Sequence, residues 1–252
     1  MPNDDPRRKR LWVAIERKRL SVEDKQTRRI HDALQDSITP VLERLRSQGP
    51  QDAIDDIESE INQQAIEDGY IDLYQSVGVS FAWDTFEGLT MQKQADDTLE
   101  DIWLERLKNF AQTEAGARIV GVTDFTVEEV RKVLEKGIQE GWGIDKIARE
   151  IRSSNGMSMT RARRVSRTEI VSASNEGSMI GARATSLNLK KIWLATMDAR
   201  VRATHFQADG QQRGMEEDFR VGGYEADYPG DPSLPAGESI NCRCTVVHKT
   251  YD

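Results

Sequence analysis

Proline is absent from residues 51–228 of this 252-residue chain: four of its seven prolines lie at or before Pro50, and the other three lie within residues 229–235. Proline breaks helix interiors more strongly than any other residue, so a proline-free stretch of this length permits long helices. The chain is 37% hydrophobic and 31% charged, which suits elongated helices with much exposed surface or a subunit that buries surface against partners. We therefore predict mainly helix between the two groups of prolines.

Residues 1–120 show apolar side chains at helical spacing, interrupted by glycine and proline. The spacing predicts long charged helix over residues 7–48, with a break near Pro40 and an end at Gly49-Pro50. An acidic helix is predicted next, then a second one that begins after Gly69, and then a helix over residues 99–110. We interpret residues 1–120 as a helical docking or assembly region.

In residues 121–252 the sequence pattern changes after Asn188, from helix-like spacing to strand-like and loop-like segments. Before it, a break at residues 116–124 and the capping-box spacing of Thr126 and Glu129 predict a helix over 126–139, followed by helices near 144–151 and 158–186. After it, residues 190–196 and 240–248 are predicted strands, and Asp198 is predicted to cap a short helix that runs to His205. The fold class is therefore α+β: long charged helices in the N-terminal half, and a C-terminal domain of helices packed on a small antiparallel sheet.

The net charge of −8 comes from one segment. Residues 51–100 hold 1 Lys or Arg against 13 Asp or Glu, whereas residues 1–50 hold 12 against 8 and residues 158–191 hold 7 against 2. Binding of duplex DNA is driven by Lys and Arg that neutralise phosphates, so the acidic segment argues against DNA binding by the whole chain. We expect this segment to face solvent or a basic protein surface.

Neither a membrane span nor a disulfide is expected. No run approaches the ~20 apolar residues of a transmembrane helix, and the first ten residues lack the apolar core of a signal peptide. We expect a soluble protein made in a cytoplasm, with no membrane partner. A disulfide between Cys242 and Cys244, which are one residue apart, would be strained, so we expect both thiols to be reduced.

An ordered set of short motifs over residues 125–248 resembles one known family. The motifs are Arg161-Ala-Arg-Arg-Val-Ser-Arg-Thr-Glu169, Asn175-Glu-Gly177, Trp193, Asp198 to His205, Asp209-Gly-Gln211, Tyr228-Pro-Gly-Asp-Pro232, Pro235-Ala-Gly-Glu238 and Asn241-Cys-Arg-Cys244. Each is weak alone, but their order and spacing are specific. Together they resemble the Mu F-like phage head morphogenesis family. The positions taken as the family motif are Arg200, Arg202, His205, Asp209, Gly210, Pro229, Gly230, Asp231, Pro232, Asn241, Cys242 and Cys244.

This resemblance implies a minor head protein of a tailed bacteriophage, without enzymatic activity and without a required cofactor. It places the protein in the virion, in the head interior or near the portal, after synthesis in the host bacterial cytoplasm. The implied partners are the portal protein and the major capsid or scaffold protein, with packaged DNA as a further partner. The implied role is in head assembly and DNA packaging, and it extends to delivery with the genome.

His205, Cys242, Cys244 and His248 offer two imidazoles and two thiolates, the ligands of a structural zinc site. In a strand, residues two apart point to the same face, so the two cysteines could approach one ion. One intervening residue is fewer than zinc-binding cysteine pairs usually have. The other interpretation is that both cysteines are small buried side chains and that His205 bonds to a loop.

His205 could also act with Arg200, Arg202 and Asp209 as a nuclease-like catalytic group, with histidine as acid or base and arginine binding phosphate. The alternative is a salt-bridged structural helix. Asp209-Gly210 is predicted to form a tight turn with positive φ at the glycine, and residues 229–237 an exposed loop that could dock a partner.

Arg161, Arg163, Arg164 and Arg167 are the best candidates for contact with nucleic acid or an acidic partner. Their spacing distributes them over more than one helix face, and no Trp or Tyr accompanies them as a stacking platform. The alternative is a solvated helix whose arginines pair with neighbouring carboxylates. The basic residues 7–10 have the same two interpretations: a tail exposed to solvent, or an arm that contacts DNA.

Overall fold

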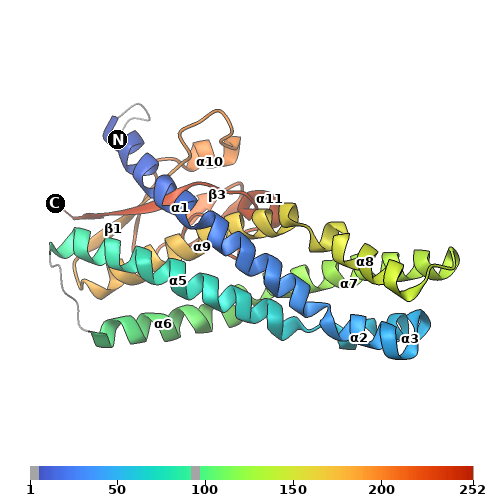
Figure 1. The fold of residues 1–252 in the computed structure, drawn as a ribbon. Helices are drawn as coiled ribbons and strands as arrows, with labels where there is room; N and C mark the ends of the chain where they lie inside the picture. The colour runs from blue at the N-terminus through green and yellow to red at the C-terminus, as the bar shows by residue number, and fades with distance from the viewer. Residues whose placement is uncertain (1–5, 92–96, 252) are drawn as a thin grey trace.

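Long helices account for most of the computed structural model, which describes residues 6–91 and 97–251 (Figure 1). The helices are α1 (Pro6–Ser37), α2 (Thr39–Gln48), α3 (Pro50–Asp55), α4 (Ile57–Glu60), α5 (Gln63–Thr90), α6 (Asp97–Gln112), α7 (Gly116–Gln139), α8 (Ile144–Ser153), the 3-10 helix η1 (Asn155–Met157), α9 (Met159–Ala184), α10 (Ala203–Ala208) and α11 (Ala236–Ser239). The strands are β1 (Leu189–Leu194), β2 (Gln212–Gly214), β3 (Phe219–Val221), β4 (Tyr224–Ala226) and β5 (Thr245–Thr250). No helix among these described residues is long and apolar enough to cross a membrane.

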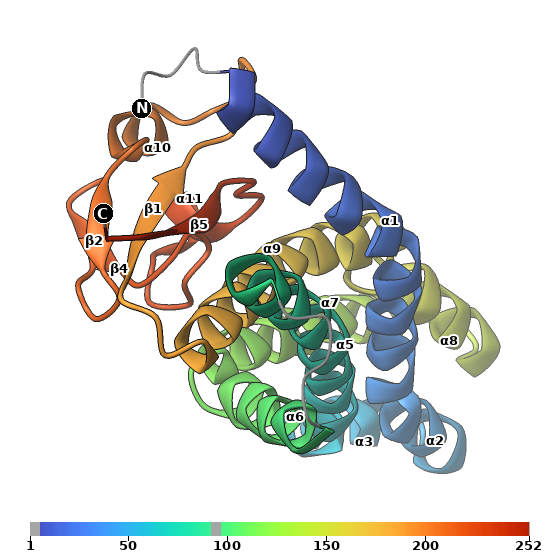
Figure 2. The same cartoon turned by 90° about the vertical axis from the view of Figure 1, so that its left-hand side faces the viewer.

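The predicted α+β fold class is confirmed by two small antiparallel sheets in the part of the chain after α9. One sheet has the strand order β2-β1-β5, with Trp193 opposite Val246, and the other is the β3-β4 hairpin. Gly222 and Gly223, both with positive φ, form the turn between Val221 and Tyr224. In Figure 2 the strands lie to one side of α5 and α9, and α1 runs from the strand region down along the helices.

Helices α1, α5 and α9 form the centre of the molecule, and α5 against α9 is the most extensive packing between any two described elements. Buried residues of both predicted regions belong to one hydrophobic cluster that includes Leu34, Leu73, Leu134 and Trp193. The predicted boundary between residues 1–120 and 121–252 falls inside α7. Both regions bury side chains in this one core. The division of the chain into two regions stays a prediction.

The breaks predicted near Pro40 and at Gly49-Pro50 are confirmed, because α1 ends at Ser37 and Gly49, with φ of 99°, separates α2 from α3. The helix start after Gly69 is wrong. Gly69 lies inside α5, where it faces Ala33 of α1 so closely that an added Cβ would be 2.8 Å from the Ala33 Cβ. Glycine here serves close helix packing and does not end the helix.

The predicted break at residues 116–124 is also wrong, because α7 is continuous from Gly116. Thr126 therefore lies inside the helix and caps nothing: its hydroxyl donates to the carbonyl of Val122 over 2.8 Å. Ile119, Thr126 and Val130 are buried along one face of α7, and this burial keeps a helix that the local sequence pattern would interrupt.

The last two corrections concern the C-terminal segment. Helix α10 begins at Ala203 and has Arg202 at its N-cap position, so Asp198 does not cap it. The final strand begins at Thr245, because Asn241 has a φ of 56° and interrupts any extended strand at that point. Cys242 and Cys244 therefore lie in the short irregular segment between the turn at residues 240–241 and β5.

Candidate functional site

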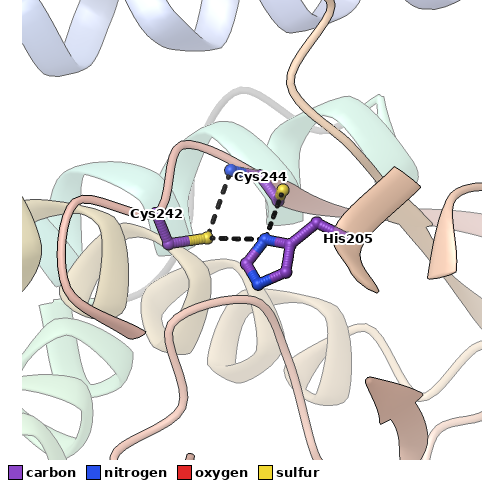
Figure 3. A group of neighbouring side chains, drawn as sticks. All are labelled: His205, Cys242 and Cys244. Atoms are coloured by element: carbon purple, nitrogen blue, oxygen red, sulfur yellow. Dashed lines mark hydrogen bonds between the residues drawn. The ribbon is translucent and has the colours of Figure 1, made fainter. Parts of the chain in front are cut away.

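His205, Cys242 and Cys244 meet in the interior, with His205 coming from α10 and the cysteines from the irregular segment before β5 (Figure 3). His205 Nδ1 lies 3.3 Å from the Cys244 sulfur and 3.7 Å from the Cys242 sulfur. One potential ligand atom from each residue lies within 4.8 Å of the others. All three residues are almost fully buried. Three of the four predicted metal ligands are therefore brought together.

His248 lies elsewhere. Its Nε2 is 3.4 Å from the sulfur of Met179 in α9, and its backbone pairs with Lys191 of β1. Desolvation, together with the positive charges of Lys191 and Arg183, lowers the pKa of its imidazole to about 4. The structure does not bring this fourth predicted ligand to the other three, because His248 is inside β5, four residues beyond Cys244.

Neighbouring groups fix the imidazole of His205. The ring of Trp193 packs against it edge-on, with the centroids 5.6 Å apart. Nε2 lies 3.0 Å from Glu238 Oε2, within ion-pair distance although outside hydrogen-bond geometry. Glu238 is in turn held by the hydroxyl of Thr204, which donates to it over 2.8 Å. Nδ1 therefore faces the two sulfurs while Nε2 faces a carboxylate.

The two thiols differ electrostatically. A hydrogen bond from Cys244, together with the Cys244 backbone N–H and the charges of Arg19 and Arg202, lowers the pKa of Cys242. Burial raises the pKa of Cys244 well above its usual value. The pair therefore favours ionisation of Cys242 first.

Arg19 of α1 is a buried cation beside this cluster that sequence reasoning missed. Its guanidinium donates to the Ser174 hydroxyl, the Cys244 carbonyl and the Asn175 side-chain oxygen over 2.8–3.2 Å. Burial lowers its pKa from the usual value. Arg19 lies among many basic residues of α1, so nothing in the local sequence distinguishes it.

A cavity of about 550 Å³ adjoins the cluster and reaches Cys242. Arginines from four separate segments line it, together with the carboxylates of Glu16 and Glu23: Arg19, Arg167, Arg200, Arg202 and Arg243. Because these arginines are far apart in sequence, only the fold reveals that they surround one cavity.

The predicted nuclease-like group is not assembled. Arg200 is exposed and bonds to Asp198, while Arg202 donates to the carbonyl of Ile240 over 2.5 Å. Asp209 forms an ion pair with Arg8 and accepts the backbone N–H of Ala195. The Asp209-Gly210 turn is as predicted, with a φ of 79° at Gly210.

Asp198 serves a different purpose from the predicted helix cap. Both of its oxygens accept hydrogen bonds from Arg243, at 2.6 and 2.9 Å. This paired hydrogen bond lowers the pKa of Asp198 strongly. It joins the segment before α10 to the residue between the two cysteines.

The four arginines of α9 do not form one basic surface. Arg161 is buried and donates to the Thr126 hydroxyl and to the carbonyls of Gly156 and Val122, over 2.6–3.1 Å. Arg163 and Arg167 lie toward Glu23 of α1, with the Arg167 pair at 2.8 Å. Arg164 is exposed. Direct contact by Arg161 with a partner is therefore contradicted by its burial.

The 229–237 loop is anchored through its first residues and is not wholly exposed as predicted. Pro229 and Gly230 are buried. The side-chain amide of Asn175 donates to the Pro229 carbonyl over 2.6 Å, and Arg118 donates to the carbonyls of Gly230 and Asp231. Asp231 also accepts the backbone N–H groups of Asp227 and Ser233. Gly230 and Asp231 are therefore positions that shape the loop.

Comparison of the sequence with known protein families finds a match to one family. Residues 128–247 match the family described as Phage Mu protein F like protein. That segment is similar to this family, which confirms the resemblance inferred from the motifs. No solved structure matches the chain.

Three curated proteins illustrate the range of its relatives. The chain is 32% identical over 133 residues to NAD(+)--arginine ADP-ribosyltransferase EFV of Enterococcus faecalis, covering 52% of this chain and 27% of that protein. It is 29% identical over 125 residues to Minor head protein GP7 of Bacillus phage SPP1, covering 48% and 40%. It is 28% identical over 125 residues to Uncharacterized protein YqbB of Bacillus subtilis, covering 48% and 41%. The matched segments thus span only about a quarter to two fifths of these relatives.

Proposed function

We propose that this protein is a minor head protein of a tailed bacteriophage that acts without enzymatic turnover in head assembly. The observation that carries the proposal is the family match over residues 128–247 together with the similarity to Minor head protein GP7 of Bacillus phage SPP1. Arg200, Arg202 and Asp209 each make a contact with another part of the chain, to Asp198, the Ile240 carbonyl and Arg8, which supports a structural role for them.

The finer part of the proposal is docking on the portal or the inner capsid. Helices α3 and α4 lie at the end of the molecule away from both termini (Figure 1), and they expose the carboxylates of Asp52 and Asp55, which we call the acidic tip, beside Glu58, which pairs with Arg131. Carboxylates at a protruding end favour a basic protein surface and disfavour the phosphates of DNA. We therefore propose that the acidic tip contacts a basic face of the portal or capsid protein.

Co-sedimentation with procapsids tests this docking. The purified chain is mixed with procapsids of the phage that encodes it, assembled with and without portal protein. We expect retention by one or both particles and a loss of retention when D52K and D55K are combined. The matched control, D101K with E105K, reverses two exposed charges on α6 and should bind normally. Equal retention of both double variants would contradict a role for the acidic tip.

A transferase is the second candidate, favoured only by the similarity to the ADP-ribosyltransferase. The matched 133 residues are 27% of that protein, so the similarity leaves most of the transferase without a counterpart. The third candidate, an internal head protein that binds DNA, rests on the exposed Arg164 and the basic start of α1. It predicts an affinity for DNA that falls steeply with salt.

A further inference from the structure

We propose that His205, Cys242 and Cys244 bind a soft divalent metal ion, with zinc as the natural occupant, through one imidazole nitrogen and two thiolates. These three residues are the only group of at least three His, Cys, Asp or Glu among residues 6–91 and 97–251 whose ligand atoms cluster in this way. Sulfur and imidazole ligands select zinc over magnesium or calcium, which prefer oxygen.

The two nitrogen–sulfur distances fit a tetrahedral ion, and the two sulfur atoms lie within 4.8 Å of each other. With Zn–S and Zn–N bonds of about 2.3 and 2.0 Å at tetrahedral angles, a sulfur and a nitrogen ligand lie about 3.5 Å apart. The observed separations from His205 Nδ1 are 3.3 Å to Cys244 and 3.7 Å to Cys242, on either side of that value. An ion can therefore be bound with small side-chain shifts and without rearrangement of the backbone.

The backbone between the cysteines already has a shape that suits two thiolate ligands. Asn241, with a φ of 56°, turns the chain immediately before Cys242. The backbone N–H of Cys244 then points at the Cys242 sulfur over 3.4 Å. An N–H group aimed at a sulfur stabilises its negative charge. The turn thus overcomes the limitation of the single intervening residue, which would be harder to accommodate in an extended strand.

The imidazole is oriented as metal-binding histidines are. Nδ1 faces the sulfurs, and Nε2 lies 3.0 Å from Glu238 Oε2. Metal-bound histidine commonly has a carboxylate beside its second nitrogen, which holds the ring and strengthens the ligand. Glu238 is therefore a positioning residue for His205 and not a fourth ligand.

The fourth coordination position is filled by water in this proposal. His248 is directed to Met179, so it does not complete the set. Cys242 lines the arginine-rich cavity of about 550 Å³, which gives solvent a route to the ion. Three protein ligands plus water is an arrangement that zinc adopts when its site is not closed.

Metal analysis of the purified full-length chain, made without a metal-affinity step, tests the proposal. We expect one zinc per chain, and we expect cobalt(II) in its place to give the intense near-ultraviolet absorption of thiolate coordination. C242S and C244S should each lose the band, and E238Q should weaken binding by about 10- to 100-fold. H248Q is the matched control and should bind metal as the unchanged chain does.

Three results would overturn the site: a zinc content near zero with no cobalt band, metal uptake that persists when C242S and C244S are combined, or loss of metal in H248Q equal to that in C242S. Circular dichroism monitors the folding of each variant. Should the cysteine variants fail to fold, the cobalt spectrum of the unchanged chain decides, because thiolate coordination is visible there without any substitution. The assay uses the isolated chain, so its outcome is independent of the proposed role in the phage head.

Discussion

Gly177 of α9 and Gly78 of α5 meet backbone to backbone, so closely that a Cβ added to Gly177 would lie 2.0 Å from the Gly78 carbonyl oxygen. One turn further along, a Cβ at Gly181 would lie 2.1 Å from the carbonyl oxygen of Ala82. The Asn175-Glu-Gly177 motif of the family segment is thus built against a helix that precedes that segment. Residues on either side of the family boundary depend on each other for packing.

Substitution G177A should destabilise the protein by about 3 kcal/mol, because the methyl group can be accommodated only by moving two packed helices apart. The measurement is the midpoint of urea unfolding. G121A is the control: it also lies within a helix, but an added Cβ has nothing within 4 Å, so it should stabilise by about 0.5–1 kcal/mol. Equal effects of the two substitutions would show that α5 and α9 are not in close contact.

Substitution R161K should cost about 2–3 kcal/mol of folding stability. The guanidinium of Arg161 reaches three acceptors at once, and a single ammonium leaves some of those buried oxygens without a donor. R164K changes an exposed arginine of the same helix and should stay within about 0.5 kcal/mol. Thermal unfolding followed by circular dichroism compares the two, and an unchanged midpoint for R161K would argue that Arg161 is free to contact a partner.

Asn175 joins three parts of the fold, so N175D should be strongly destabilising. Its amide donates to the carbonyls of Pro229 and Cys244, and its oxygen accepts from Arg19, Thr245 and Val246. A carboxylate cannot donate, so two buried carbonyls would lose their partner at a cost of about 3 kcal/mol. N109D, on the exposed side of α6, should change little. A small effect of N175D in urea unfolding would contradict this network.

Glu176 makes stability fall as the pH rises. Burial raises the pKa of its carboxyl group, and Arg106, 3.9 Å away, offsets only part of that rise, so the pKa moves from 4.5 to about 7. Between these values the folded chain holds a proton that the unfolded chain has released. Stability from this group is therefore full below the unfolded pKa of 4.5 and is lost as the pH rises through about 7.

The difference in unfolding free energy between E176Q and the unchanged chain should therefore grow in favour of E176Q with rising pH. The change between about pH 4 and about pH 8 should be on the order of 3 kcal/mol. Comparing the two chains cancels the titration of other groups, including His248, whose lowered pKa destabilises the fold in acid. A difference that stays constant over this range would mean that Glu176 is not protonated in the folded state.

The chain should not transfer ADP-ribose from NAD to arginine side chains. The relative named as a transferase is 32% identical to this chain over an aligned segment of 133 residues, which is 27% of that relative's length. Labelled NAD is incubated with the purified chain and an arginine-rich acceptor protein, with an active transferase as the positive control. Label on the acceptor that depends on this chain would establish the enzymatic candidate and contradict the assembly proposal in its non-enzymatic form.

Much of the fold could be predicted because the signals were local. The absence of proline, the Gly49-Pro50 break and the helix predicted near residues 158–186 each correspond to features that the structure contains. Gly69 was misleading because a glycine that ends a helix and one that permits close approach of another helix look the same in sequence. Only the neighbouring helix, which is far away in the chain, distinguishes them.

The candidate site was predictable in its residues and less so in its geometry. His205, Cys242 and Cys244 meet, whereas His248 does not join them, because the turn at Asn241 changes where the strand begins. Arg161 carried the same charge as its neighbours, but the helix phase buries it against α7. Arg19 and Glu238 could not be assigned to the cluster, since their positions depend on how α1 and the 229–240 segment pack around it.

The most direct test of the proposed role is to determine whether the chain is a component of phage particles. Procapsids and mature virions of the phage that encodes it are purified by density gradient, and their proteins are quantified by mass spectrometry against the unassembled fraction of the lysate. We predict that this chain sediments with procapsids, virions or both, at a few copies per particle relative to the major capsid protein. Absence from both particle types, with the chain recovered only in the unassembled fraction, would contradict its assignment as a head protein.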